Sequence, residues 1–424
     1  MRYHLHVEYC FHAVGQGLFA SGELEDVAGS DIRLRWVYDC GTTSSQSLVK
    51  KAIIYESMAR RRLGRIDVMA LSHFDADHIS GVIELLGSNE VDILLIPYLP
   101  LVQRRALAET EGIGRSHPLH KLFENPAHFI AEIEGAKVRR LVLVPGGASG
   151  PPPDDEPPDF GEGGPTLDIE PGEPDPEDAR DFEEISQAGR VSGIEVHLLR
   201  VGGRVRLKGI WEFMPYNDAE FAPQATPAFR AAAINRATRM LAGLGARDQE
   251  LKLLCRLYDR AFGTGSRARN IISLFLYAGP LRMRYAHSHL EVGRSPKRPK
   301  GGIGFSHPGL NHNRGAPPGR FGILYTGDGY LDTKARLKTL MTQLGPRRKA
   351  DLSCVQVMHH GSQKNWSPGV AATFSPDWSV FSSDPGHLRF RHPHEPVVVD
   401  FAGFGPIQVD RKHHAVIRAC VDIG

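Results

Sequence analysis

The densest group of ionisable side chains lies in the segment Ser72–Gly81, which reads SHFDADHISG. Its two histidines and two aspartates are His73, Asp75, Asp77 and His78. The apolar run IDVMAL comes directly before it and predicts a short buried strand. Histidine nitrogens and carboxylate oxygens in this mixture suit borderline or hard divalent cations such as zinc and manganese. The alternative is a polar turn in which Asp77 caps a helix that begins near Ile79.

Three other segments place histidines or carboxylates directly after strand-like runs. They are FGILYTGD ending at Asp328, VMHHGS with His359 and His360, and FRHPH with His392 and His394. Loops at strand ends can present side chains without disturbing the core, so we expect the segments to converge. A carboxylate from a separate strand, such as Asp328, can bridge two cations about 3.5–4 Å apart that together activate water. The alternative for Asp328 is an ordinary Gly-Asp-Gly turn.

The motifs of this chain, in their order, resemble those of the metallo-β-lactamase superfamily, whose signature is H-x-H-x-D-H. They are more similar to the metallo-hydrolase domain of the competence DNA-uptake protein ComEC and its stand-alone relatives, which read S-H-x-D-x-D-H-x-x-G. Further matches are AVGQG at 13–17, YDCG at 38–41, Asn270 and Ser273 in N-x-x-S, YTGD at 325–328, HHGS at 359–362 and HP at 392–393.

This resemblance implies a four-layer αββα sandwich with a metal site at the sheet ends. It makes Asp328 a bridge between two ions, and it places Asn270 where many members have a histidine. The implied ligands are His73 and Asp75 for one ion, and Asp77, His78 and His359 for the other, with His360 as the alternative to His359. Because Asp75 replaces a histidine, the donor set is harder, which shifts its preference from zinc toward manganese.

Strand-like and helical patterns alternate along the chain, which predicts an α/β fold in one domain over residues 1–424. The predicted insertions are 101–135 (helical), 151–184 (acidic), 226–262 (helical) and 287–320 (a basic loop). Residues 151–184 contain fourteen Asp or Glu against one Arg, with many Pro and Gly. Such a segment buries too little apolar surface to offset its ordering entropy, so we expect it to be disordered.

The basic loop offers four candidate contacts to a phosphate backbone: Arg294, Lys297, Arg298 and Lys300. A flexible, solvated loop is the alternative interpretation. Phe305 is the one aromatic residue between 287 and 320, so stacking with bases is not indicated there.

The bulk composition restricts the class of protein more than its function. With 424 residues, 41% of them hydrophobic, and a net charge of +2, the chain is typical of a globular protein with no preferred partner. We expect no membrane contact, because no apolar run approaches the roughly 18 residues of a membrane span. The five cysteines are scattered, which favours reduced thiols and a cytoplasmic location.

Together with the resemblance, which implies DNA degradation, and the basic loop, these patterns predict a hydrolase in which one or two divalent ions activate a hydroxide that attacks a phosphodiester. Asp77 orients the water in this scheme, and His392 is a proton donor, although a histidine that only packs its loop is an open alternative. The partners are expected to be nucleic acid and, through the insertions, other proteins. Two rivals remain: hydrolysis of a small ester or signalling nucleotide, and a partner-binding component of a multi-protein system, such as bacterial defence, with a vestigial metal site.

Overall fold

The computed structural model describes most of the chain outside the predicted insertions. The described residues are 3–27, 29, 32–59, 64–99, 101, 104, 108, 119–147, 150, 166–176, 178–207, 209–218, 273–281, 291–293, 320–387 and 390–423, with six isolated residues between 228 and 256.

The first sheet has nine described strands and is antiparallel on one side and parallel on the other. Its order is β12 (Glu291–Gly293), β17 (Ala415–Ile423), β1 (Tyr3–Phe11), β2 (Phe19–Asp26), β3 (Arg33–Cys40), β4 (Arg65–Ala70), β5 (Glu90–Pro97), β6 (Lys137–Val144) and β8 (Glu195–Leu198). The pairs from β12 to β3 are antiparallel, and those from β3 to β8 are parallel.

The second sheet has eight described strands. Its order is β16 (Pro406–Val409), β15 (Trp378–Ser382), β14 (Leu352–Gln356), β13 (Gly322–Tyr325), β11 (Leu274–Pro280), β10 (Trp211–Asn217), β9 (Val205–Leu207) and β7 (Leu167–Ile169). The strands from β13 to β16 are parallel, so their carboxyl ends meet at one edge. The other pairs are antiparallel.

The two sheets pack face to face because alternate side chains of each strand point inward. In β3, Trp36 and Tyr38 enter the layer between the sheets, whereas Val37 faces the helices outside. Trp36 Nε1 donates to the hydroxyl of Tyr325 at 3.1 Å, and the rings of Tyr38 and Tyr325 stack with centroids 4.7 Å apart. These contacts fix the second sheet against the first.

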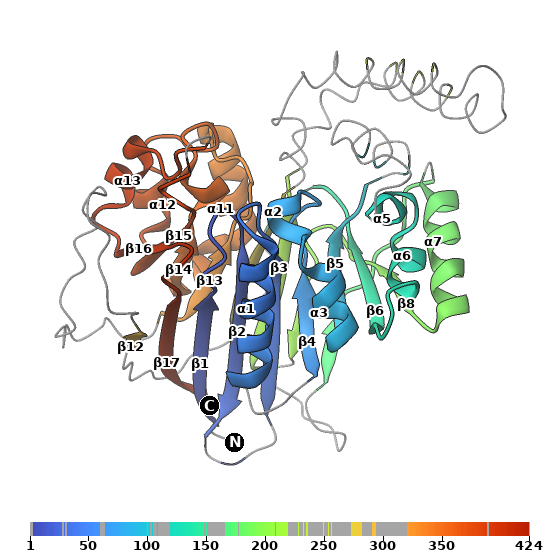
Figure 1. Ribbon diagram of the computed structural model, residues 1–424, viewed down its shortest axis with the longest axis horizontal. Coiled ribbons are helices and arrows are strands. Elements are labelled where there is room, and N and C mark those ends of the chain that lie inside the picture. The colour runs from blue at the N-terminus through green and yellow to red at the C-terminus, as the bar shows by residue number, and fades with distance from the viewer. Residues whose placement is uncertain are drawn as a thin grey trace.

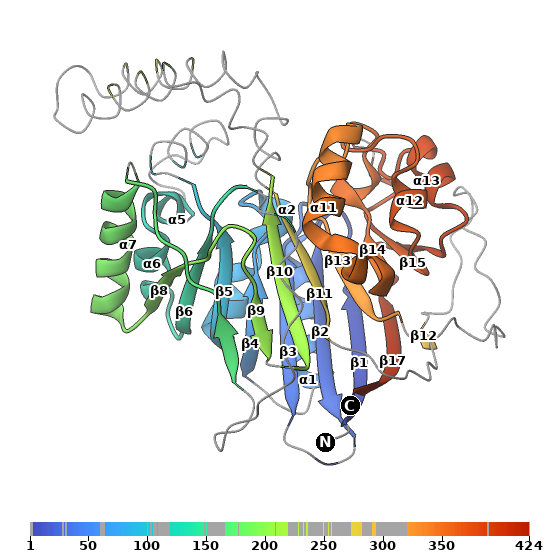
Figure 2. The ribbon, with the colours of Figure 1, turned by 180° about the vertical axis from the view of Figure 1, so that it is seen from behind.

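Helices cover the outer face of each sheet (Figures 1 and 2). Those on the first sheet are α1 (Gln46–Ala59), α3 (Val82–Ser88), α5 (His120–Glu124), α6 (Pro126–Ala131) and α7 (Ala179–Ser192). Those on the second are α11 (Lys334–Asp351), α12 (Val370–Phe374) and α13 (Glu395–Phe401). The fold is therefore the expected four-layer αββα sandwich, with α2 (Ala76–Ile79) at the upper ends of the strands in Figure 1.

The expectation that 151–184 is disordered is wrong for residues 167–169, which form β7, and for residues 179–184, which form the start of α7. β7 pairs with β9, and α7 packs on the first sheet through Ile185, with Phe182 and Ala188 partly buried beside it. These three apolar residues recur at helical spacing, a signal that the acidic composition around them obscures. Residues 151–165 lie outside the described part.

The other predicted insertions are only partly described. α5 and α6 lie within 101–135, and the Asn125 side chain caps α6 by accepting from His128 N. Within the predicted basic loop, β12 is a short strand that extends the first sheet beside β17, so this part is not loop. The candidate contacts between 294 and 300, and nearly all of 226–262, lie outside the described residues.

None of the helices that the structure describes is long and apolar enough to cross a membrane. The cysteines among the described residues are Cys10, Cys40, Cys354 and Cys420, and none of these four forms a disulfide bond with another of them.

Candidate metal centre

Segments from both sheets bring the predicted ligands to one edge of the sandwich. β4 leads to His73 and α2, and β13 leads to Asp328 in the turn that follows it. β14 leads to the 3₁₀ turn Met358–Gly361, which carries the histidine pair. Leu274 N donates to Ser72 O at 2.8 Å, which joins the two sheets beside the cluster. Asp77 lies inside α2, and Asp75 occupies the N-cap position of that helix without making a capping hydrogen bond. The interpretation of Asp77 as a helix cap is therefore wrong.

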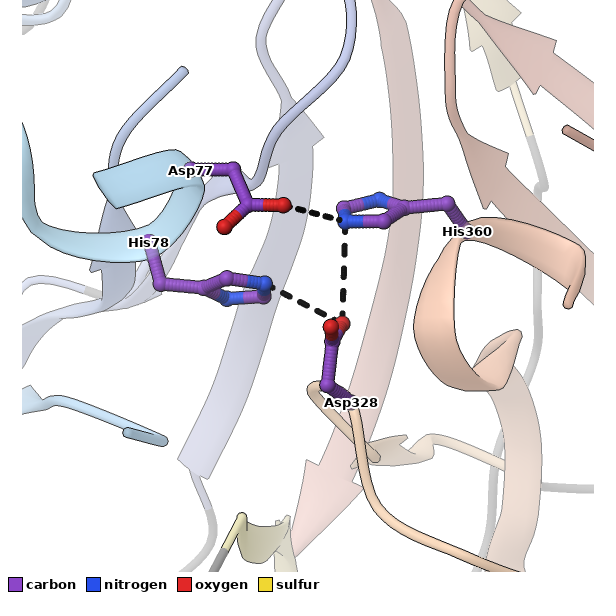
Figure 3. Close-up of side chains that lie close together, drawn as sticks. All are labelled: Asp77, His78, Asp328 and His360. Carbon is purple, nitrogen blue, oxygen red and sulfur yellow. Dashed lines mark hydrogen bonds and ion pairs between the residues drawn. The ribbon is translucent and has the colours of Figure 1, made fainter. Parts of the chain in front are cut away.

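Four side chains converge from α2, the turn after β13 and the 3₁₀ turn: Asp77, His78, Asp328 and His360 (Figure 3). His78 Nε2 lies 3.1 Å from Asp328 Oδ1, and His360 Nε2 lies 3.2 Å from Asp77 Oδ2. His360 Nε2 is also 3.6 Å from Asp328 Oδ1. Two ligand atoms each about 2.1 Å from a tetrahedral ion lie about 3.4 Å apart, so this group fits a divalent cation.

A second group adjoins the first and shares Asp77 with it. It consists of His73, Asp75 and Asp77, whose ligand atoms lie within 4.8 Å of one another. His73 Nε2 is 3.8 Å from Asp75 Oδ2 and 3.9 Å from Asp328 Oδ2. It is buried and makes no hydrogen bond to any described residue. A buried nitrogen facing two carboxylates at these distances fits a cation between them.

The structure places His360, rather than His359, beside Asp77. Both histidines have left-handed backbone conformations, with φ of +43° for His359 and +58° for His360. His360 Nδ1 lies 2.6 Å from Ser382 O and donates to it, which leaves Nε2 facing the cluster. His359 instead places Nδ1 3.2 Å from Asp328 Oδ2. Both histidines therefore face the cluster, His360 toward Asp77 and His359 toward Asp328.

Burial and neighbouring charges keep Asp77, Asp328 and His73 in the protonation states that bind metal. Burial favours neutral Asp77, but the neighbouring histidines, His78 above all, hold its pKa below the ordinary value. The pKa of Asp328 is likewise well below its usual range, because His359, His78 and His360 outweigh its burial. Burial, followed by the charge of His78, lowers the pKa of His73 to about 3. At neutral pH the carboxylates are therefore ionised and His73 is neutral.

Asp39 orients His78 by contacting the ring nitrogen that faces away from Asp328. The YDCG motif contains Asp39, but the sequence did not reveal this role. Asp39 Oδ2 lies 2.7 Å from His78 Nδ1, and the carboxylate also accepts from Ser72 N and Oγ at 2.7 and 2.6 Å. Burial alone would lower the pKa of His78, but Asp328, Asp39 and Asp77 raise it well above normal. This excess of negative charge is what a bound cation would neutralise.

Changing Asp39 to asparagine is expected to weaken metal binding about 10–100-fold without unfolding the protein. An amide cannot accept the short hydrogen bond from His78 Nδ1 as strongly, so the ring loses its fixed orientation. Metal affinity would be measured by competition with a chromophoric chelator. Asp67→Asn is the control, because Asp67 also accepts a backbone hydrogen bond, from Arg35 N at 2.8 Å, away from the cluster. Equal affinities in wild type and Asp39→Asn would contradict the orienting role.

Buried polar side chains also hold the turn that carries Asp328. Gln356 Oε1 accepts from Thr326 N and Gly327 N, both at 2.8 Å. Ser273 Oγ accepts from Asp328 N at 2.9 Å, which gives the serine of the N-x-x-S motif a structural role. Asn270 of the same motif lies outside the described residues. Gln356 carried no recognisable signal in the sequence.

His392 lies at the side of the cluster in the loop after β15. Its ring centroid is 5.5 Å from that of His359 and 6.1 Å from that of His360. Burial is the main cause that lowers its pKa, and the neighbouring histidines lower it further. His394 is half-buried, and its Nδ1 accepts from Gln363 N at 3.2 Å.

A third buried group, Cys10, His12 and Glu56, also has metal-ligating side chains. His12 Nδ1 is 3.9 Å from Cys10 Sγ, whereas His12 Nε2 is 3.1 Å from Glu56 Oε2. Opposite ring nitrogens make the shortest contacts to the two partners, although one ligand atom from each of the three side chains lies within 4.8 Å of the others. Arg35 lies 3.3 Å from the other oxygen of Glu56, which identifies the group as an internal ion network.

No protein-family model and no curated protein sequence matches this chain. Among solved structures, the chain is similar to a long form RNase Z from yeast, with 11% identity and a TM-score of 0.34. The match covers 96% of this chain but 41% of that one, so the present chain spans about two fifths of its length. The assignment of the fold therefore rests on the two sheets, their helical layers and the position of the cluster. These are the features that the resemblance to the metallo-β-lactamase superfamily implies.

Proposed function

We propose that the chain is a metal-dependent hydrolase of the metallo-β-lactamase superfamily, similar to the ComEC-like group, and that it cleaves phosphodiester bonds. The double use of Asp328 is the observation that carries this proposal. Its Oδ1 faces His78 and His360. Its Oδ2 faces His73 and His359. A carboxylate between two pairs of histidines suits a site that binds one or two cations.

Each member of the cluster has a role in this proposal. The residues that would hold the ions are His73 and Asp75 for the first, Asp77, His78 and His360 for the second, and Asp328 for both, with His359 beside Asp328. When bound, such ions lower the pKa of water and neutralise charge on a phosphoryl group. Asp77 also orients the attacking water by accepting its hydrogen bond. His392 faces the departing oxygen, and the carboxylate-rich donor set admits manganese as well as zinc.

The proposed substrate is nucleic acid, on the strength of the ComEC-like motifs and the basic residues between 294 and 300. A small ester or a signalling nucleotide is the alternative substrate. A regulatory component that binds protein partners through the insertions is the alternative role, and the ligand set of the cluster argues against a vestigial site. We place the protein in the cytoplasm because its five cysteines are scattered along the sequence, a pattern that favours reduced thiols.

Metal analysis of the purified protein, combined with hydrolysis assays, tests the proposal. We expect one or two zinc or manganese ions per chain, and cleavage of single- or double-stranded DNA that stops when the ions are removed by a chelator and resumes when manganese or zinc is restored. Protein that binds neither metal, or that binds metal but cleaves neither DNA nor a simple phosphodiester, would contradict it.

Neutralising the basic residues together should weaken DNA binding and its salt dependence. In the variant Arg294→Gln, Lys297→Gln, Arg298→Gln, Lys300→Gln, the slope of log K against log salt should fall by about 0.9 for each lost contact to double-stranded DNA. Fluorescence anisotropy over a salt series measures this slope. The control neutralises four exposed basic residues outside the basic loop, namely Lys50, Lys137, Arg139 and Arg180. An unchanged slope in the first variant would remove the loop from DNA recognition.

A further inference from the structure

Gln16 is held in a rigid loop between β1 and β2, immediately beside the cluster. Its backbone N donates to Ser44 Oγ at 2.9 Å, and its carbonyl accepts from Thr43 N at 2.8 Å. The next residue, Gly17, has a φ of +157°, and a Cβ there would lie 2.4 Å from Gly41 O, so glycine is required for this close approach. The Gln16 residue is 1% exposed, so its side chain extends from a fixed and buried base.

The side chain of Gln16 joins two parts of the loop after β15. Its Oε1 accepts from Asp384 N at 3.4 Å, and its Nε2 lies 3.4 Å from His392 Nδ1. A backbone N–H can only donate, so the end of the amide facing Asp384 must be the oxygen. The end facing His392 is then the NH₂ group, which also can only donate. His392 Nδ1 must therefore accept, and a neutral imidazole that accepts at Nδ1 carries its proton at Nε2.

We infer that Gln16 is a positioning residue that holds His392 as the neutral, Nε2-protonated imidazole. This role rests on the proposed function: His392 assists by donating a hydrogen bond to the departing oxygen, and it does not act as an imidazolium acid. His392 is 5% exposed and lies beside His359 and His360. A second positive charge next to a site for cations would be repelled, whereas a neutral N–H stabilises developing negative charge without that cost.

The chemical step balances without a further reactant. The water oxygen forms a bond to phosphorus, and the bond from phosphorus to the leaving oxygen breaks with its electron pair. The leaving oxygen accepts the hydrogen bond from His392 Nε2 and takes its proton from solvent. The proton lost by the attacking water returns to solvent, so His392 ends the step in the state in which it began.

Nuclear magnetic resonance of protein labelled with ¹⁵N-histidine reads the tautomer directly, at neutral pH and without an assay of activity. Two-bond correlations from the ring C–H groups distinguish a protonated from an unprotonated ring nitrogen, and the His392→Asn spectrum identifies the signals of His392. We expect Nδ1 to be the unprotonated nitrogen in the wild type. Gln16→Glu should move the proton to Nδ1, because a carboxylate oxygen there can only accept. The exposed Gln363→Glu adds the same charge nearby and should leave the tautomer unchanged.

Kinetics then tests the role of the Nε2–H group. Compared with the wild type, Gln16→Glu should lose at least about tenfold more kcat on DNA, whose leaving group is a poor alkoxide, than on bis(p-nitrophenyl) phosphate, whose leaving group needs little help. Wild-type protein protonated at Nδ1, or a Gln16→Glu variant with an unchanged tautomer, would overturn the positioning role. Equal losses on both substrates would overturn the contact with the departing oxygen. Wild-type protein that cleaves neither substrate would instead refute the proposed function, while the tautomer result would still stand.

Discussion

Replacing Asp328 with alanine is expected to lower phosphodiester hydrolysis by at least about 10³-fold and to reduce the number of bound ions. Asp328 is 2% exposed, and its two oxygens face opposite sides of the cluster. In the proposed site, removing Asp328 takes away the ligand that the two ions share, whereas removing Asp75 takes a ligand from one ion. Asp328→Asn keeps the shape but loses the charge, so its loss of activity should be nearly as large.

The measurements are metal content by mass spectrometry and initial rates at saturating manganese or zinc. Thermal unfolding and circular dichroism verify that each variant is folded. Asp92→Ala is the matched control, because Asp92 is a partly buried carboxylate that pairs with Arg140 at 2.7 Å, on strands distant from the histidines. Full activity and full metal content in Asp328→Ala would show that the cluster is not the metal centre.

The second large effect concerns stability and lies at the opposite end of the second sheet. Glu212 is fully buried in β10, and its carboxylate accepts from Arg348 Nε at 2.7 Å, from Arg204 Nη1 at 2.9 Å and from Arg347. Arg204 and Arg348 are themselves almost fully buried. Glu212→Ala would leave these guanidinium groups without their shared carboxylate, which should cost about 3–5 kcal/mol of unfolding free energy.

Urea unfolding of wild type and Glu212→Ala measures this cost. Glu183→Ala is the control, since Glu183 pairs with Arg190 on the exposed face of α7 and should cost less than about 1 kcal/mol. Burial would raise the pKa of Glu212, but the arginines, Arg348 foremost, lower it below the ordinary value. The stabilisation is therefore present above about pH 4.3 and is lost as the pH falls through the lowered pKa, so the two proteins should converge in acid. A cost equal to that of the control would contradict this account.

The sequence determined the class of fold and which ionisable segments come together. The order of these segments predicted that Asp77, His78 and Asp328 converge, because each motif directly follows an apolar run whose end must lie at a sheet edge. Alternating strand and helix patterns predicted the layers that the two sheets and their helices form. Both signals are local, since they depend on residues within one strand or one turn of each other.

The tertiary structure decided which side chain faces which. The inward position of His360 depends on left-handed φ values at two adjacent residues, which no periodic pattern reveals. Asp39 contacts the ligand His78 across 39 residues, Gln356 contacts Gly327 beside Asp328 across 29 residues, and Gln16 contacts His392 across 376 residues. Partners so distant in the chain are brought together only when both sheets are packed, so the residues that orient the site become visible only in the folded protein.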